Sequence, residues 1–140
     1  MSFLLDTNVC IEILRGRNPT LQTRLRQASQ ENLAICAIVR GELLCGARLA
    51  RDPARELARL AVFDELQDYP FDSIAAEQYS LIRVHLQQQG RLIGAYDLLI
   101  AAIALAHNLT LVTHNTSEFS RVPGLRLEDW QESSNDSTLQ

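Results

Sequence analysis

Short apolar runs alternate along the chain with longer segments of helical periodicity. Five runs have the length and composition of strands, and they cover residues 2–5, 33–38, 66–71, 110–113 and 125–127. Parallel strands need crossover connections, and helices supply them. The pattern therefore predicts an α/β fold of three layers, with a central, mostly parallel sheet of four or five strands covered by helices on both faces.

The segments between these runs predict helices that begin at capping residues. They cover residues 8–15, 19 to about 30, a segment that contains Glu42 and ends near Leu49, and residues 53–65, 73–89, 95–107 and 115–119. The helix at 95–107 is apolar on almost every side and only Asp97 interrupts it, so we expect it to be buried on most of its faces.

The length and composition predict one globular domain. The chain has 140 residues, of which 46% are hydrophobic and 21% charged. We expect the domain to span residues 1–130, followed by a polar, disordered tail at 131–140. The three cysteines have no C-x-x-C spacing and apolar neighbours, which predicts reduced core residues. The sequence begins without a leader pattern and holds no membrane-spanning run, so we expect a cytoplasmic protein.

The charged residues exclude several mechanisms. All thirteen basic residues are arginine, so lysine-dependent chemistry such as Walker A phosphate binding or Schiff-base formation is excluded. The net charge is −4, but residues 1–60 hold nine arginines against six acids. A polyanion would therefore meet the first half of the chain, where Arg48, Arg51, Arg55 and Arg59 form either a solvated helical stripe or a track for an RNA backbone.

Three acidic residues stand out from the ordinary solvated ones. Asp6 directly follows an apolar strand, and either caps the next helix or lies in the crevice at the carboxyl ends of the strands. Glu42 lies between Gly41 and Gly46, which suggest that another backbone approaches closely; its alternative is an ion pair with Arg40 or Arg48.

Asp97 is the most informative of the three, because a carboxylate at the start of an apolar helix needs compensation by the helix dipole, by hydrogen bonds or by a cation. Acids that converge repel one another unless a cation joins them. Oxygen ligands of this type select Mg²⁺ or Mn²⁺, which serve phosphoryl chemistry.

Four motifs in order carry a resemblance to a known family. They are Phe-Leu-Leu-Asp6-Thr7-Asn8, Arg-Gly-Glu42-Leu, Gly94-Ala-Tyr-Asp97-Leu-Leu-Ile-Ala-Ala and Leu-Val-Thr113-His-Asn115-Thr-Ser-Glu118-Phe. Their order and spacing resemble a PIN domain, most closely the VapC-type toxins of bacterial toxin-antitoxin pairs. The similarity extends from residue 3 to about 130, including the segment that ends at Trp130.

This resemblance implies a metal-dependent endoribonuclease that cleaves RNA, with tRNA or rRNA loops as the family-like substrates. The catalytic residues would be Asp6, Glu42, Asp97 and Asn115; Mg²⁺ or Mn²⁺ would be held by the three acids with Glu118; and Thr7 and Thr113 would contact the acids or the phosphate. Many members have a fourth acid where this chain has Asn115, so Glu118 either reaches the site or only caps its own helical turn. A cognate antitoxin and a homodimer are the implied partners.

Two other interpretations remain at this point. A strand followed by aspartate also begins haloacid-dehalogenase-like phosphatases and receiver domains, but these generally use a lysine that the chain lacks. A PIN-like fold that only binds a partner protein is the other alternative. The histidines, His85, His107 and His114, have no metal-binding spacing, and His114 is interpreted as a loop side chain beside the site.

Overall fold

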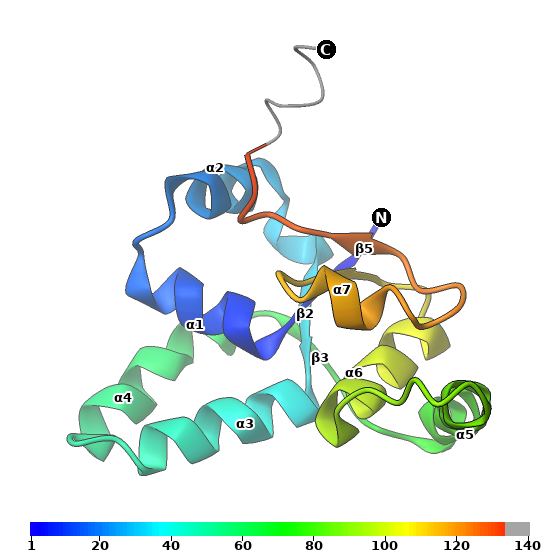
Figure 1. Ribbon diagram of the computed structural model, residues 1–140. Helices are drawn as coiled ribbons and strands as arrows, with labels where there is room; N and C mark the ends of the chain where they lie inside the picture. The colour runs from blue at the N-terminus through cyan, green and yellow to red at the C-terminus, as the bar shows by residue number, and fades with distance from the viewer. Residues whose placement is uncertain (134–140) are drawn as a thin grey trace.

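A computed structural model of the chain, which describes residues 1–133, contains a sheet of five parallel strands (Figure 1). The strands are β1 (Phe3–Leu5), β2 (Leu33–Cys36), β3 (Gln67–Tyr69), β4 (Thr110–Val112) and β5 (Leu127–Glu128), in the spatial order β3-β2-β1-β4-β5. Leu4 of β1 is aligned with Ala34 of β2 and with Leu111 of β4. The predicted α/β fold is confirmed, and every strand pair is parallel.

Seven α-helices in the described part of the chain connect and cover the strands. They are α1 (Thr7–Arg15), α2 (Pro19–Gln27), α3 (Ala37–Arg48), α4 (Pro53–Arg59), α5 (Ser73–Gln88), α6 (Ala95–Ala106) and α7 (Thr116–Phe119), with short 3₁₀ turns at Gln30–Asn32 and Leu60–Phe63. Helices α1, α2 and α4 lie on one side of the sheet, and α5, α6 and α7 on the other (Figure 1). None of the described helices is long and apolar enough to cross a membrane.

The strand order creates a topological switch point at the centre of the sheet. The chain proceeds outward from β1 to β2 and β3, and then returns to β4 on the other side of β1. In sheets of this kind the crevice beyond the carboxyl ends of the two diverging strands is where ligands bind. Asp6 follows β1 and Thr113 follows β4, so both residues lie at that crevice.

The core is formed by the central strands and by α6. Leu4, Ile35 and Leu111 have no exposed surface, and residues 100–104 of α6 are likewise fully buried. An α-helix exposes one face unless it is covered on all sides; here α5, α3 and β4 all pack against α6. The expectation that α6 is buried on most faces is confirmed.

Element boundaries differ from the sequence predictions where tertiary pairing sets them. The predicted strand at 125–127 is displaced to Leu127–Glu128, because residues 127 and 128 align with Leu111 and Val112 of β4. The helix predicted over 53–65 ends at Arg59 and continues as the 3₁₀ turn. Most of the predicted tail, residues 134–140, lies outside the described residues.

The cysteines divide into two buried thiols and one exposed thiol. Cys10 and Cys36 are fully buried, as predicted, but the prediction for Cys45 is wrong, because its position on α3 faces outward. Burial raises the pKa of Cys10, and raises that of Cys36 to about 11. Thiolates are the reactive form.

We therefore expect a thiol reagent to modify one of the three cysteines rapidly in the native protein, and the other two only after denaturation. Peptide mapping after brief labelling at pH 8 checks this, and the modified residue should be Cys45. Equal labelling of all three native thiols would contradict the fold around β2.

Candidate active site

Asp6 is a buried carboxylate held by three elements at the switch point. Its side chain is 5% exposed. Oδ1 accepts the Thr7 N–H at the start of α1 at 2.8 Å, and Oδ2 accepts the Thr113 hydroxyl at 2.8 Å. Both alternatives that the sequence leaves open for Asp6 therefore hold, because the residue is the N-cap of α1 and also lies at the crevice.

The two threonines position acids. Thr113 has no exposed surface, and its Oγ1 also accepts the backbone N–H of Asn115 at 3.0 Å. Of the roles that the family resemblance implies for Thr113, contact with an acid is seen in its hydrogen bond to Asp6. Thr7 donates its hydroxyl to Glu42 Oε1 at 2.7 Å, which brings α3 to α1.

Among the described residues, Glu42 forms no ion pair with Arg40 or Arg48, the alternative that the sequence left open. Arg40 instead donates to Asp68 at 2.7 Å and to Asp64 at 3.3 Å. The expectation of a close backbone approach at Gly41 and Gly46 is wrong, because a Cβ added at either position would meet nothing within 4 Å. Both glycines lie on the exposed face of α3.

Gly94, at the start of α6, is the glycine beside which two of the acids lie, at ordinary contact distance. A Cβ there would lie 3.4 Å from Asp97 Oδ2 and 3.7 Å from Glu118 Oε1. The Gly94 N–H donates to Glu118 Oε1 at 2.7 Å, and Asn115 Nδ2 donates to Glu118 Oε2 at 2.8 Å. Glu118 thus contacts the N-cap of its own helix, Asn115, and at the same time reaches the start of α6, where Asp97 lies.

The electrostatics of the acids show how strongly they interact. Burial, followed by the charges of Asp6 and Glu118, raises the pKa of Asp97 to about 7. Burial also raises the pKa of Asp6, against the hydrogen bonds from the threonines. The hydrogen bonds from Gly94 and Asn115 lower the pKa of Glu118. Ionising all four groups together is therefore costly unless a cation is bound among them.

The donor set fits a hard divalent cation. It consists of carboxylate oxygens alone, which suit Mg²⁺ or Mn²⁺, and within residues 1–133 none of the four acids forms an ion pair with an arginine. In the described part of the chain no three of these acids bring oxygens within 4.8 Å of one another. Each hydrogen-bonded carboxylate oxygen points toward its donor. The carboxylates therefore surround the crevice but do not meet at one point.

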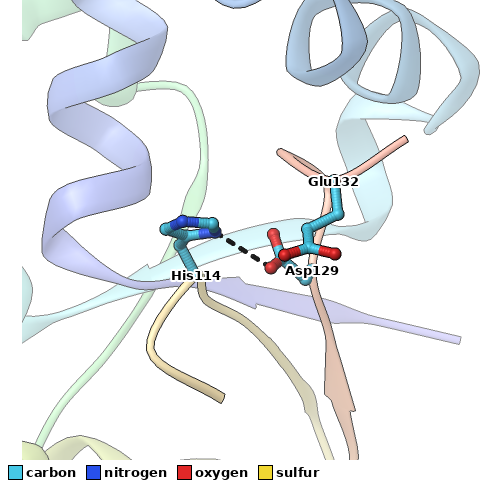
Figure 2. Close-up of side chains that lie close together, drawn as sticks. All are labelled: His114, Asp129 and Glu132. Carbon is cyan, nitrogen blue, oxygen red and sulfur yellow. Dashed lines mark hydrogen bonds and ion pairs between the residues drawn. The ribbon is translucent and has the colours of Figure 1, made fainter. Parts of the chain in front are cut away.

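Sequence reasoning missed a second group beside the crevice. His114, Asp129 and Glu132 have ligand atoms within 4.8 Å of one another, and Figure 2 shows His114 Nδ1 directed at Asp129 Oδ2, 2.9 Å away. The signal was available, because His114 follows β4 and Asp129 follows β5. The ends of neighbouring parallel strands meet at one edge of a sheet, whatever their separation in sequence.

Comparison with known proteins identifies the family. The family model for the PIN domain matches residues 3–125 of this chain. The chain belongs to the PIN-domain family. It is 37% identical to the tRNA(fMet)-specific endonuclease VapC of Shigella flexneri, over 93% of this chain and 98% of that protein.

Solved structures show the same relationship for this PIN domain. It is similar to a chain of DNA-bound VapBC from Salmonella typhimurium, with a TM-score of 0.87 and 34% identity, over 93% of this chain and 98% of that one. It is also similar to a chain of VapBC2 from Rickettsia felis bound to a promoter DNA fragment. The TM-score is 0.86 and the identity 35%, over 93% of this chain and 99% of that one. The PIN domain is therefore a ribonuclease of the VapC type, as the sequence resemblance implied.

Proposed function

We propose that this PIN domain is the toxin of a toxin-antitoxin pair and cleaves RNA with the help of Mg²⁺ or Mn²⁺. The observation that carries the proposal is the cluster of four acids at the switch point, where Asp97 has a pKa of about 7 and no arginine of the described chain forms an ion pair with the group. Such a cluster is stable in its ionised form only with a bound cation. The identity with VapC ribonucleases supports the same assignment.

Asp6, Glu42, Asp97 and Glu118 would hold the ion, and this chain already orients three of them by hydrogen bonds. Asp6 is fixed by Thr113 and Thr7, Glu42 by Thr7, and Glu118 by Gly94 and Asn115. A divalent ion among such acids supplies an activated water and neutralises the charge that develops on a phosphate. The proposed catalytic role of Asn115 is to aim Glu118, because its amide donates to that carboxylate.

The proposed substrate is a single-stranded loop of a structured RNA. Loops present splayed nucleotides to a crevice, whereas A-form helices do not. A relative is named as specific for tRNA(fMet), and a tRNA is therefore the first substrate to test. Arg48, Arg51 and Arg55 are exposed near the end of α3 and the start of α4, while Arg59 is paired with Glu56 and bonded to Leu14 O. The three exposed arginines provide an RNA track, and binding along it would weaken as salt is raised.

A cognate antitoxin and a second copy are the proposed partners. The structurally similar VapBC-5 from Mycobacterium tuberculosis is described as a member of the VapBC family of toxin-antitoxin systems. An apolar groove of about 280 Å³ between α1, α3 and α4 extends to Glu42 and is lined by Ile11, Leu14 and Leu43, so the tail of an antitoxin seated there would reach the acids. For the homodimer, the exposed Leu49, which directly follows α3, and Tyr96 of α6 line a second apolar cavity of about 440 Å³.

The decisive experiment compares RNA cleavage by the purified wild type and by Glu42→Gln, each with Mn²⁺ and with EDTA. We expect the wild type to cleave an unmodified tRNA only with Mn²⁺, and Glu42→Gln to be slower by more than about 100-fold, since even outer-shell partners of metals cost 10–100-fold. Glu77→Gln, an exposed change on α5, is the matched control. Cleavage in EDTA, or cleavage of tRNA by neither protein, would refute the proposal, and the latter result would favour a non-catalytic binding module.

The role of Glu118 has its own test. We expect Glu118→Gln to bind Mn²⁺ about 10-fold more weakly by isothermal titration, because the amide oxygen still accepts from Gly94 but contributes no charge. Glu31→Gln, an exposed site, should leave the affinity unchanged. Equal affinity in Glu118→Gln and wild type would mean that Glu118 only ties the start of α6 to α7.

A further inference from the structure

A polar cavity adjoins Asp6, and neither Asp97 nor Glu118 belongs to its lining. Its volume is about 380 Å³, and its lining includes Asp6, Asn8, Arg15, His114, Asn115 and Gln131. Three other cavities of the described chain are lined mainly by apolar side chains. A cavity of this size holds a small polar ligand, and its hydrogen-bonding groups would decide which one.

His114, which lines this cavity, is held in one orientation. Asp129 Oδ2 lies 2.9 Å from His114 Nδ1 (Figure 2). Asp129 Oδ1 accepts the backbone N–H of Gln131 at 2.9 Å. The Asp129 side chain is 15% exposed, whereas that of His114 is 56% exposed. Because a carboxylate only accepts, Nδ1 carries the proton that it donates, and the Nε2 edge of the ring remains for a ligand.

Arg15 lines the same cavity beside Glu12 and contributes its one arginine side chain. It extends from the last turn of α1 and is held by Glu12, with Nη1 3.0 Å from Oε1. A guanidinium pairs with phosphate oxygens in a fork geometry that an ammonium group does not offer. Imidazole and amide side chains hydrogen-bond to base edges, and imidazoles also stack on unpaired bases. The lining thus matches both parts of a nucleotide.

We propose that this cavity binds the nucleotide next to the scissile bond and makes the enzyme selective for its base. Asp6 lines the cavity and also belongs to the acidic cluster, so a nucleotide held here is adjacent to the phosphate at the acids. Arg15 contacts the phosphate, and His114, positioned by Asp129, contacts the base. The inference rests on the proposed nuclease function, since it names part of the substrate of that site.

The first test measures binding without catalysis. Side-chain NMR of ¹⁵N-histidine protein is recorded in EDTA during titration with each of the four ribonucleoside 5′-monophosphates. EDTA prevents a metal held by His114, Asp129 and Glu132 from producing the signal. We expect at least one nucleotide to shift the ring resonance that is absent in His114→Gln, and to leave the resonance of the exposed His85 unchanged. The absence of a His114 shift with all four nucleotides would overturn the inference.

The second test measures selectivity during cleavage. RNA with a randomised loop is cut in the presence of Mn²⁺, and the ends are sequenced. We expect wild type and His85→Gln to share a preference at one position flanking the cut, and His114→Gln to lose about 5-fold or more of it. Arg15→Gln should raise KM more than it lowers kcat, and the nearby exposed Arg17→Gln should not. An unchanged preference in His114→Gln would overturn the inference, whereas lack of cleavage by the wild type would refute the nuclease proposal and leave the NMR result to decide.

Discussion

Replacing Asp97 with asparagine is expected to abolish RNA cleavage and, at the same time, to stabilise the metal-free protein. The asparagine side chain would keep the shape of the neutral aspartate but would lack the charge that holds a cation, so we expect the cleavage rate to fall by more than about 100-fold with Mn²⁺ present. Gel analysis of tRNA cleavage measures this. A variant with wild-type activity would remove Asp97 from the proposed set of ligands.

The effect of Asp97→Asn on stability follows from the raised pKa. The pKa is about 7 in the folded chain against 3.8 for the free side chain, so the folded state favours the protonated form. Stability contributed by this group is therefore present at acidic pH and is lost as pH rises from about 4 to about 7. A shift of this size corresponds to about 4 kcal/mol for a fully buried group. Asp97 is partly exposed, and solvent screening lowers the expected gain for Asp97→Asn to about 1–2 kcal/mol at pH 8.

Urea denaturation in EDTA at pH 8 and at pH 5 provides the measurement. The advantage of Asp97→Asn should shrink by more than half at pH 5, because the folded wild type is then protonated. Mn²⁺ at pH 8 should stabilise the wild type and have little effect on the variant. An advantage that does not change with pH would show that it arises from packing rather than from the charge of Asp97.

Replacing Trp130 with alanine is expected to cost about 3–5 kcal/mol of unfolding free energy. The side chain is 2% exposed, and its ring meets Phe3 edge to face, with centroids 5.1 Å apart. Its Nε1–H donates to Glu128 Oε1 at 2.9 Å, the same oxygen that pairs with Arg24 at 2.9 Å. Trp130 therefore joins β5, β1 and α2, and its removal would release the last strand of the sheet.

Trp130→Phe and Leu92→Ala are the controls for this measurement. Phenylalanine retains most of the buried ring and loses the hydrogen bond, so we expect a cost of about 1–2 kcal/mol. Leu92 is 44% exposed, and its truncation should change stability by less than about 0.5 kcal/mol. A loss from Trp130→Ala as small as that from Leu92→Ala would place the domain boundary before residue 130.

Much of the fold was predictable because it depends on local patterns. The predicted runs at residues 2–5 and 110–113 match strands β1 and β4 to within one residue, since both strands are central and largely apolar. The edge strand β5 begins two residues later than predicted, because it has few residues and only one partner, β4, whose register decides where it begins. The exposed face of α3, with Gly41, Cys45 and Gly46, was wrongly predicted to be packed because short-range sequence does not show which side of a helix is covered.

The candidate site, like the fold, was predictable from the sequence only in part. Asp6 and Asp97 were identifiable in sequence, because an acid among apolar residues needs an explanation at its own position. The orientation of Glu118 was not, since it depends on the Gly94 N–H, 24 positions away, and on the Asn115 amide. The pairing of His114 with Asp129 depends likewise on the neighbouring ends of β4 and β5.

The order of residues was enough to specify the elements of this protein, the family to which it belongs and the acids proposed to carry its chemistry, because periodicity, capping and isolated charges are properties of near neighbours along the chain. The folded arrangement was needed to establish which donor fixes each acid, how far the pKa of Asp97 rises, and which polar side chains share a cavity with Asp6. These features depend on distances between residues that are far apart in sequence and come together only at the switch point of the folded sheet. Electrostatic and hydrogen-bond energies vary steeply with such distances.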